Sequence, residues 1–103
     1  MANFQIRNRY TDEIIVEGEA ETLKEFVVNN KANLSEANLS NMDLSEINLS
    51  GANLKKANMI NTDFYNTDLR GADIEGSDVS ATIIASAIME ENQIEEIIEI
   101  LNK

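Results

Sequence analysis

An apolar residue recurs at every fifth position from Leu34 to Val79, and a small residue usually stands two places before it. A helix advances about 100° per residue, so this spacing would scatter the apolar side chains around its axis. In a strand, successive members would alternate between the two faces, because five is an odd number. The period therefore predicts neither element. It favours a chain that bends after each short extended piece and points the central side chain inward.

The repeating units occupy residues 31–80 and read KANLS, EANLS, NMDLS, EINLS, GANLK, KANMI, NTDFY, NTDLR, GADIE and GSDVS. Two degraded units, ATIIA and SAIME, follow and end at Glu90. We expect the central residues to form a core ladder of Leu34, Leu39, Leu44, Leu49, Leu54, Met59, Phe64, Leu69, Ile74 and Val79. Ile84 and Met89 would extend this ladder into the degraded units.

These units resemble the pentapeptide-repeat family, whose unit is written A-(D/N)-L-x-x. The resemblance implies a mainly β fold, a right-handed quadrilateral parallel β-helix with four units per coil, and hence about 2.5–3 coils here. Residues twenty apart would then stack at about 4.8 Å, the spacing of hydrogen-bonded strands. Two pairs of opposite charge, Glu36 with Lys56 and Lys55 with Glu75, fall on that register.

The two flanks are interpreted as caps within a single domain, with residues 1–30 before the β-helix of residues 31–90 and a helix in residues 91–103. A stacked coil needs atypical ends, because its last backbone groups and its core are otherwise uncovered. At the N-terminal end, alternation predicts a β-hairpin with a three-residue loop, Thr11–Glu13. That loop would pair Tyr10 with Ile14, Asn8 with Val16 and Arg7 with Glu17.

Thr22 and Glu25 form a capping-box pattern that predicts a short helix over Leu23–Asn29. A hairpin followed by such a helix also resembles the segment that precedes the repeats in many bacterial and phage members of the family.

The C-terminal segment predicts an amphipathic helix whose apolar stripe is Ile94, Ile97, Ile98 and Leu101, with Asn92 and Glu95 as its cap. Two interpretations of the stripe stay open. It covers the last coil, or it also packs against a second copy of the chain as a homodimer interface. Ile100 lies off the stripe, and the first interpretation would leave it exposed.

The composition argues against catalysis. The chain has no cysteine and no histidine, which removes thiolate sites and the commonest general base and metal ligand. Asp63, Asp68, Asp73 and Asp78 recur every five residues and would face away from one another, so they cannot converge on a calcium ion. We expect no catalytic residue, no cofactor and no metal site.

The net charge of −11 disfavours direct binding to nucleic acid or to an anionic membrane, because both are polyanions. No apolar run is long enough to span a bilayer, and the N-terminus has no apolar signal core, so we expect a cytoplasmic protein. The preferred function is a non-enzymatic structural or protein-interaction module whose protein partner is unknown. Ile60, Tyr65 and Arg70 are the least repeat-like outward residues and form the candidate contact wall.

The alternative is an acidic DNA mimic that binds DNA gyrase or another topoisomerase, as some proteins of the resembling family do. The charge suits this function, but the length does not. Three coils would rise only about 14 Å, which is the span of about 8 phosphates of duplex DNA.

Overall fold

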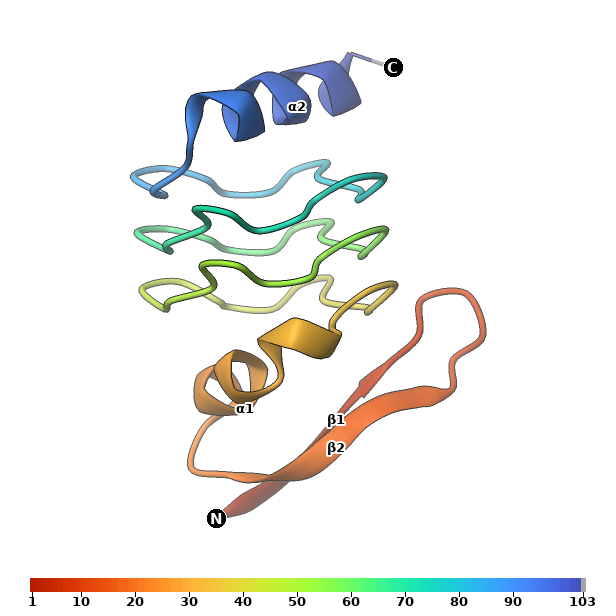
Figure 1. Cartoon of the computed structure of the whole chain (residues 1–103). Helices are drawn as coiled ribbons and strands as arrows, with labels where there is room; N and C mark the ends of the chain where they lie inside the picture. Colours follow the sequence, from red (N-terminus) through yellow and green to blue (C-terminus); the bar gives the residue numbers. More distant parts are fainter. Residues whose placement is uncertain (103) are drawn as a thin grey trace.

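The computed structural model describes residues 1–102. A hairpin and a short helix stand at one end, a stack of turns forms the middle, and a second helix lies at the other end (Figure 1). The elements are β1 (Ala2–Arg7), β2 (Ile14–Ala20), α1 (Leu23–Asn29), a 3-10 turn (Lys31–Asn33) and α2 (Glu91–Leu101).

The middle of the chain is held together by parallel bridges between residues twenty apart. One column joins Asn38, Asn58 and Asp78, and others join Asp43, Asp63 and Ile83, and Asn48, Asp68 and Ile88. Between levels, the N–H of a central residue donates to the carbonyl nineteen positions onward, as from Leu39 to Asn58 at 2.9 Å. The spacing that the repeat implies is thus the spacing at which the backbone stacks.

The core lies inside this stack. All ten residues of the ladder are buried, and the most exposed of them, Val79, is only 5% exposed. Ile84 and Met89, in the degraded units, are half-buried. Thr62 and Thr67 stand in the column of small residues and donate their hydroxyls to the carbonyls of Leu39 and Leu44, so these buried polar groups are satisfied.

The hairpin forms, but its predicted register is wrong by two residues. Ile6 pairs with Val16 and Arg7 pairs with Ile14, across a bulge, so the loop covers residues 8–13. The inward face is kept, because a shift of two preserves the alternation of side chains. The loop is longer because Arg7, which still pairs with Ile14, and Arg9 also bond to the first coil. Asn38 donates to the carbonyl of Arg7, and Arg9 donates to that of Glu36, both at 2.8 Å.

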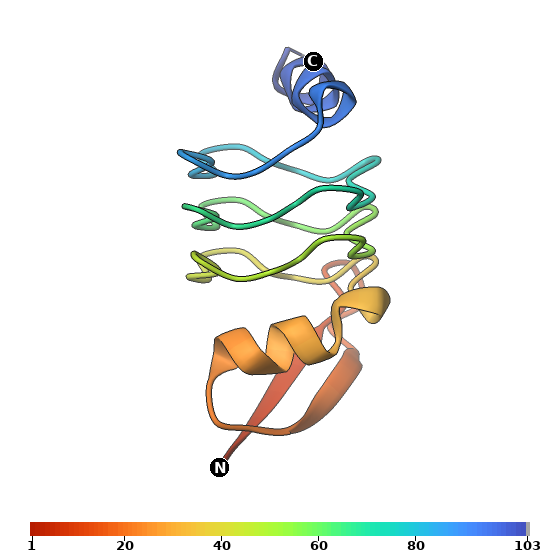
Figure 2. The same cartoon turned by 60° about the vertical axis from the view of Figure 1, so that its left-hand side comes forward.

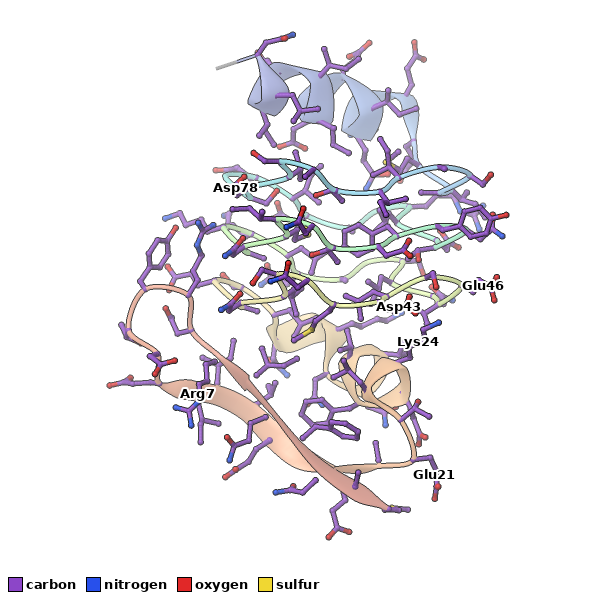
Figure 3. The ribbon with its side chains drawn as sticks, turned by 180° about the vertical axis from the view of Figure 1, so that it is seen from behind. Arg7, Glu21, Lys24, Asp43, Glu46 and Asp78 are labelled. Atoms are coloured by element: carbon purple, nitrogen blue, oxygen red, sulfur yellow. The ribbon has the colours of Figure 1, made fainter. Side chains whose placement is uncertain are left out.

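Helix α1 has the predicted bounds and seals the N-terminal end of the stack. Thr22 accepts a hydrogen bond from the N–H of Glu25, but the Glu25 carboxylate accepts from Glu21, so the reciprocal half of the capping box is not made. Phe26 and Val27 are buried. Lys24 points toward the first coil, with its Nζ 3.8 Å from Asp43 Oδ1 (Figure 3).

Helix α2 begins at Glu91, within the predicted segment of residues 91–103, but its cap is not the predicted one. Its N-cap is Glu90, not Asn92, and the side-chain oxygen of Gln93 accepts from the N–H of Glu90 at 2.8 Å. The helix lies above the last level and off the centre of the coil end (Figure 2).

Candidate interaction site

Each corner of the stack is a turn that the repeat itself stabilises. After the central Leu34, for example, Glu36 has a φ of 61° and the N–H of Ala37 donates back to the Leu34 carbonyl. In nine consecutive units, from Asn38 to Asp78, the Asn or Asp oxygen accepts the N–H two residues onward. Such local bonds from Asn and Asp are typical of turns. The Asn and Asp oxygens at this repeat position therefore stabilise the turns of the backbone.

The structure does not bring the candidate contact wall onto one face. Ile60, Tyr65 and Arg70 sit at three successive corners, where their carbonyls accept the N–H groups of the level below. Arg70 makes a bidentate ion pair with Asp68 of its own unit, with N–O distances of 3.1 Å and 2.9 Å. These hydrogen bonds lower the pKa of Asp68 to about 2. The guanidinium is already engaged, which weakens the case for a shared contact surface at these three residues.

The last two units depart from the pattern of the turns. Ile83 and Ile88 stand in the column that Asn or Asp occupies below them, directly above Asp63 and Asp68. Both side chains are exposed. These two units have exchanged a turn-stabilising acceptor for an outward apolar group.

The predicted stripe of α2 is not the face that it buries. Gln93 and Ile97 are buried and Ile100 is packed against the core, whereas Ile94, Ile98 and Leu101 are exposed. The helix is rotated because Gln93 Nε2 donates to the carbonyls of Leu69 and Ala72, at 2.5 Å and 3.0 Å. The capping interpretation of the stripe would leave Ile100 exposed, whereas Ile100 is partly buried and packs against the core.

Gln93 takes the place of a missing fourth level. In the stack, the Ala52 carbonyl accepts the backbone N–H of Asp73, twenty-one residues later. Gln93 stands twenty-one residues after Ala72 and supplies the same bond from its side chain. The sequence signal for this face was that Gln93 lies at helical spacing from Ile97 and Ile100. The prediction missed it because it considered only apolar residues.

Exposed apolar side chains gather at this end of the molecule. We call them the open-end surface: Ile83, Ile88, Ile94, Ile98 and Leu101, each between 45% and 54% exposed. At about 100° per residue, the exposed flank of α2 lies about a quarter turn from its buried face. Glu96 and Glu99 lie on the opposite flank beside Glu75. The two flanks of α2 therefore differ, because one is apolar and the other is acidic.

Within residues 1–102, the core of the stack has little room for a bound ligand. A cavity of about 10 Å³ lies under α2, between Leu69, Ile74 and Met89, which is about the space that one water needs. No group of three or more Asp or Glu side chains is placed to hold a metal ion in this part of the chain. No helix here is long and apolar enough to cross a bilayer.

Comparison with known proteins agrees with the stacked turns. The family model described as pentapeptide repeats matches in eight copies, over residues 32–71 and 47–84. The chain is a member of the pentapeptide-repeat family. A solved structure with the same fold is a pentapeptide repeat protein, Rfr23, from the cyanobacterium Cyanothece 51142. It is 37% identical, with a TM-score of 0.55 over 57% of this chain and 40% of that one. The chain thus spans well under half the length of Rfr23, and no curated protein matches it.

Pentapeptide-repeat proteins are β-helical modules for structure and protein interaction and are generally not enzymes. The match to the family model ends at residue 84, so Ile88 and α2 lie beyond the recognisable repeat. Four of the five residues of the open-end surface thus lie beyond the match, and Ile83 lies just inside it.

Proposed function

We propose that this chain is a non-catalytic protein-interaction module that pairs with a second copy of itself through the open-end surface. We take its stack to wind as the right-handed, four-sided β-helix of the family. The observation that carries the proposal is the half-covered coil end, where five large apolar side chains remain about half exposed. Large apolar side chains that stay exposed at one end of a molecule are candidates for burial against a partner.

A second copy suits this surface because α2 rises above only part of the coil end, which makes the surface stepped. Helix α2 lies off the centre of the coil end (Figure 2), and Ile94, Ile98 and Leu101 stay exposed on its outer flank. A two-fold axis through the step would place α2 of each copy beside the uncovered rim of the other, which is the self-complementary contact that a symmetric dimer requires. A stable interface buries about 800 Å² per partner. That is about a seventh of the accessible surface of 5664 Å².

The exchange of Asp or Asn for Ile83 and Ile88 supports the same proposal. An Asp at either position would accept the N–H two residues onward, as Asp63 and Asp68 do one level below. Exposed isoleucines give up that bond and add apolar surface. This arrangement costs the isolated monomer stability, whereas in a dimer the burial of the isoleucines offsets the cost.

The mass of the chain in solution tests the proposal. We expect light scattering after size exclusion to give twice the monomer mass of 11.5 kDa. Ile98→Glu should give the monomer mass, because it places a charge in the apolar contact. Ile83→Asp with Ile88→Asp should also give monomers while the melting temperature is kept or raised, since both changes restore the turn acceptor. Ile14→Ser removes an exposed apolar side chain in the hairpin and should leave the dimer intact. An unaltered chain that runs as a monomer at about 100 μM, well above the Kd of a stable interface, would refute the pairing.

Mimicry of DNA is the second candidate, and the net charge of −11 favours it. The molecule is 37 Å long. Its net charge per unit length is therefore about half that of duplex DNA, which carries one charge per about 1.7 Å. A gyrase supercoiling assay separates the two functions. Inhibition at micromolar protein would support the mimic, and full supercoiling activity at tens of micromolar, about the top of the range for a specific complex, would exclude it.

A further inference from the structure

The edge of the last level that faces α2 is rich in backbone N–H donors. One level below, Phe64 and Asn66 donate their N–H groups to carbonyls of the last level, at 2.7 Å and 3.2 Å. In the same unit only the carbonyl of Thr62 accepts from the last level, from the N–H of Ile83 at 2.9 Å. Two donors and one acceptor of this unit thus face the level that follows it.

Ile84 and Ser86 hold the same two donor positions in the last level, twenty residues after Phe64 and Asn66. Within residues 1–102, the N–H groups of Ile84 and Ser86 donate to no backbone carbonyl. Ile84 is half-buried and Ser86 is exposed, so another molecule can reach this edge. Because an exposed strand edge pairs readily with groups from another chain, these two donors mark a place where a partner can bond to the backbone.

Helix α2 bonds to the other side of the coil. Gln93 donates to the carbonyl of Ala72 at 3.0 Å, and Glu96 lies beside Glu75, so the helix follows the unit of residues 71–75. The unit that carries the two donors comes two units later in a lap of four, and it therefore stands opposite. A side chain of α2 thus caps one side of the last level, and the described chain supplies no such cap to the side across from it.

Two carboxylates of α2 point away from the coil end of their own chain. Glu95 lies two positions from both Gln93 and Ile97, the two buried residues, which is about 200° around the helix axis. Glu91 stands one turn before Glu95 on the same face. Both are exposed, and within residues 1–102 neither makes an ion pair. Residues four apart on a helix are about 5–6 Å apart, and donors two residues apart in a chain are at most about 7 Å apart. The spacing of the carboxylates therefore suits that of the donors.

We infer that Glu91 and Glu95 of a second copy accept the N–H groups of Ile84 and Ser86. The inference rests on the pairing proposed above and assigns polar contacts within it. When two coil ends face each other, the outward face of α2 in one copy meets the coil end of the other. A two-fold axis parallel to α2 and midway across the coil end places each helix over the donors of the other copy, so the contact is made twice. The exposed apolar flanks of the two helices then lie against each other. Hydrogen bonds that a carboxylate accepts are stronger than those between neutral groups.

Sedimentation equilibrium of matched variants tests the role of the carboxylates. Glu91→Ala with Glu95→Ala should raise the Kd of the dimer at least about tenfold, because the donors lose charged acceptors. Glu96→Ala with Glu99→Ala removes the same charge from another face of the helix. It should leave the Kd unchanged or lower it, since each copy carries a net charge of −11 and the two copies repel each other. If the first pair of changes also leaves the Kd unchanged or lowers it, repulsion alone governs these positions and the inference is overturned.

Hydrogen exchange followed by NMR locates the bonds themselves. In the unaltered dimer, the amides of Ile84 and Ser86 should exchange at least about tenfold more slowly than in the Ile98→Glu monomer. The amide of Asn66, which donates to Ala85 within one copy, should be protected in both and serves as the control. A dimer in which Ile84 and Ser86 exchange as fast as in the monomer would overturn this inference and leave the pairing standing. A chain that stays monomeric would overturn both.

Discussion

The two ends of the stack are closed to different degrees. At the N-terminal end, Leu34, Leu39, Leu44 and Leu49 are fully buried, and α1 packs beneath them with the hairpin bonded to the first level. At the C-terminal end, Ile84 and Met89 are only half-buried, and α2 lies over one side alone. The hairpin bonds the first level through its backbone, whereas α2 supplies a single side chain, Gln93, to the carbonyls of the last.

This difference teaches where the stability and the function of the molecule are to be sought. A solenoid must cover both ends to avoid edge-to-edge association. Here one end is completed within the chain, and we propose that a partner covers the other. We therefore expect changes at the N-terminal end to alter folding and changes at the C-terminal end to alter association.

The largest expected effect compares two residues of one stack. Leu49 and Met89 occupy the same column, forty residues apart, at opposite ends of the core. Leu49→Ala should lower the free energy of unfolding by about 2–5 kcal/mol, because it opens a cavity in a fully buried site. Met89→Ala should cost under about 1 kcal/mol in the monomer, since the side chain is already half-exposed. Urea denaturation of both variants in the Ile98→Glu background measures the monomer alone. Equal losses would mean that the two ends are packed alike.

A smaller effect is expected at the polar cap. Gln93→Ala should cost about 1–3 kcal/mol, because the carbonyls of Leu69 and Ala72 would lose their donor under the helix. Asn92→Ala, one position earlier and exposed, serves as the matched control and should change stability by under about 0.5 kcal/mol. Thermal unfolding followed by circular dichroism measures both. If the Gln93 and Asn92 variants melt together, the side chain does not act as a fourth level.

The smallest effects are those of pH, and they have opposite signs at the two ends. Hydrogen bonds from Ser45, with Lys24 nearby, lower the pKa of Asp43 below 3.8. The charged carboxylate therefore stabilises the fold, and this stability is lost as the pH falls through that lowered value. Asp43→Asn should melt earlier than the unaltered chain at neutral pH, and the difference should vanish at acid pH.

Glu96 should behave in the reverse way. Its pKa is raised above 4.5 by burial and then by repulsion from Asp73, Glu75 and Glu99. The folded state therefore keeps the proton longer than the unfolded chain, and stability is lost as the pH rises through the raised value. Glu96→Gln should stabilise the protein at neutral pH, by under about 1 kcal/mol for a partly exposed group, and should be neutral below the unfolded pKa. Melting curves across the acid range test both variants. A stabilised Asp43→Asn or a destabilised Glu96→Gln would contradict the contrast.

The stack was predictable because its signal is local and repeated. Each central residue is apolar, and the pairing of Asn38 with Asn58 follows once the chain is taken to turn four times in twenty residues. The bounds of α1 also followed from a local signal, the Thr22 cap. The turn bonds of the Asn and Asp column were missed, because the column was treated only as outward and solvated.

The ends were less predictable because their partners lie far away in the sequence. The predicted register of the hairpin was wrong because Arg7 bonds to Asn38 and Arg9 bonds to Glu36. The alternation of side chains within residues 1–20 cannot reveal these contacts. The rotation of α2 was missed for a similar reason. Its buried face is chosen by the carbonyls of Leu69 and Ala72, while an amphipathic pattern counts only apolar residues.

The bonds that hold each corner have a consequence for how such a rod can change its length. The Asn or Asp oxygen and the turn that it stabilises belong to one five-residue unit. One coil of four units therefore contains all of its own turn-stabilising bonds. Duplicating residues 51–70 would insert one complete level between the N-terminal and C-terminal caps. Neither α1 nor Gln93 would then contact a residue type that it does not already contact. Gene duplication could therefore lengthen or shorten the molecule in steps of twenty residues while the two termini keep their own architecture.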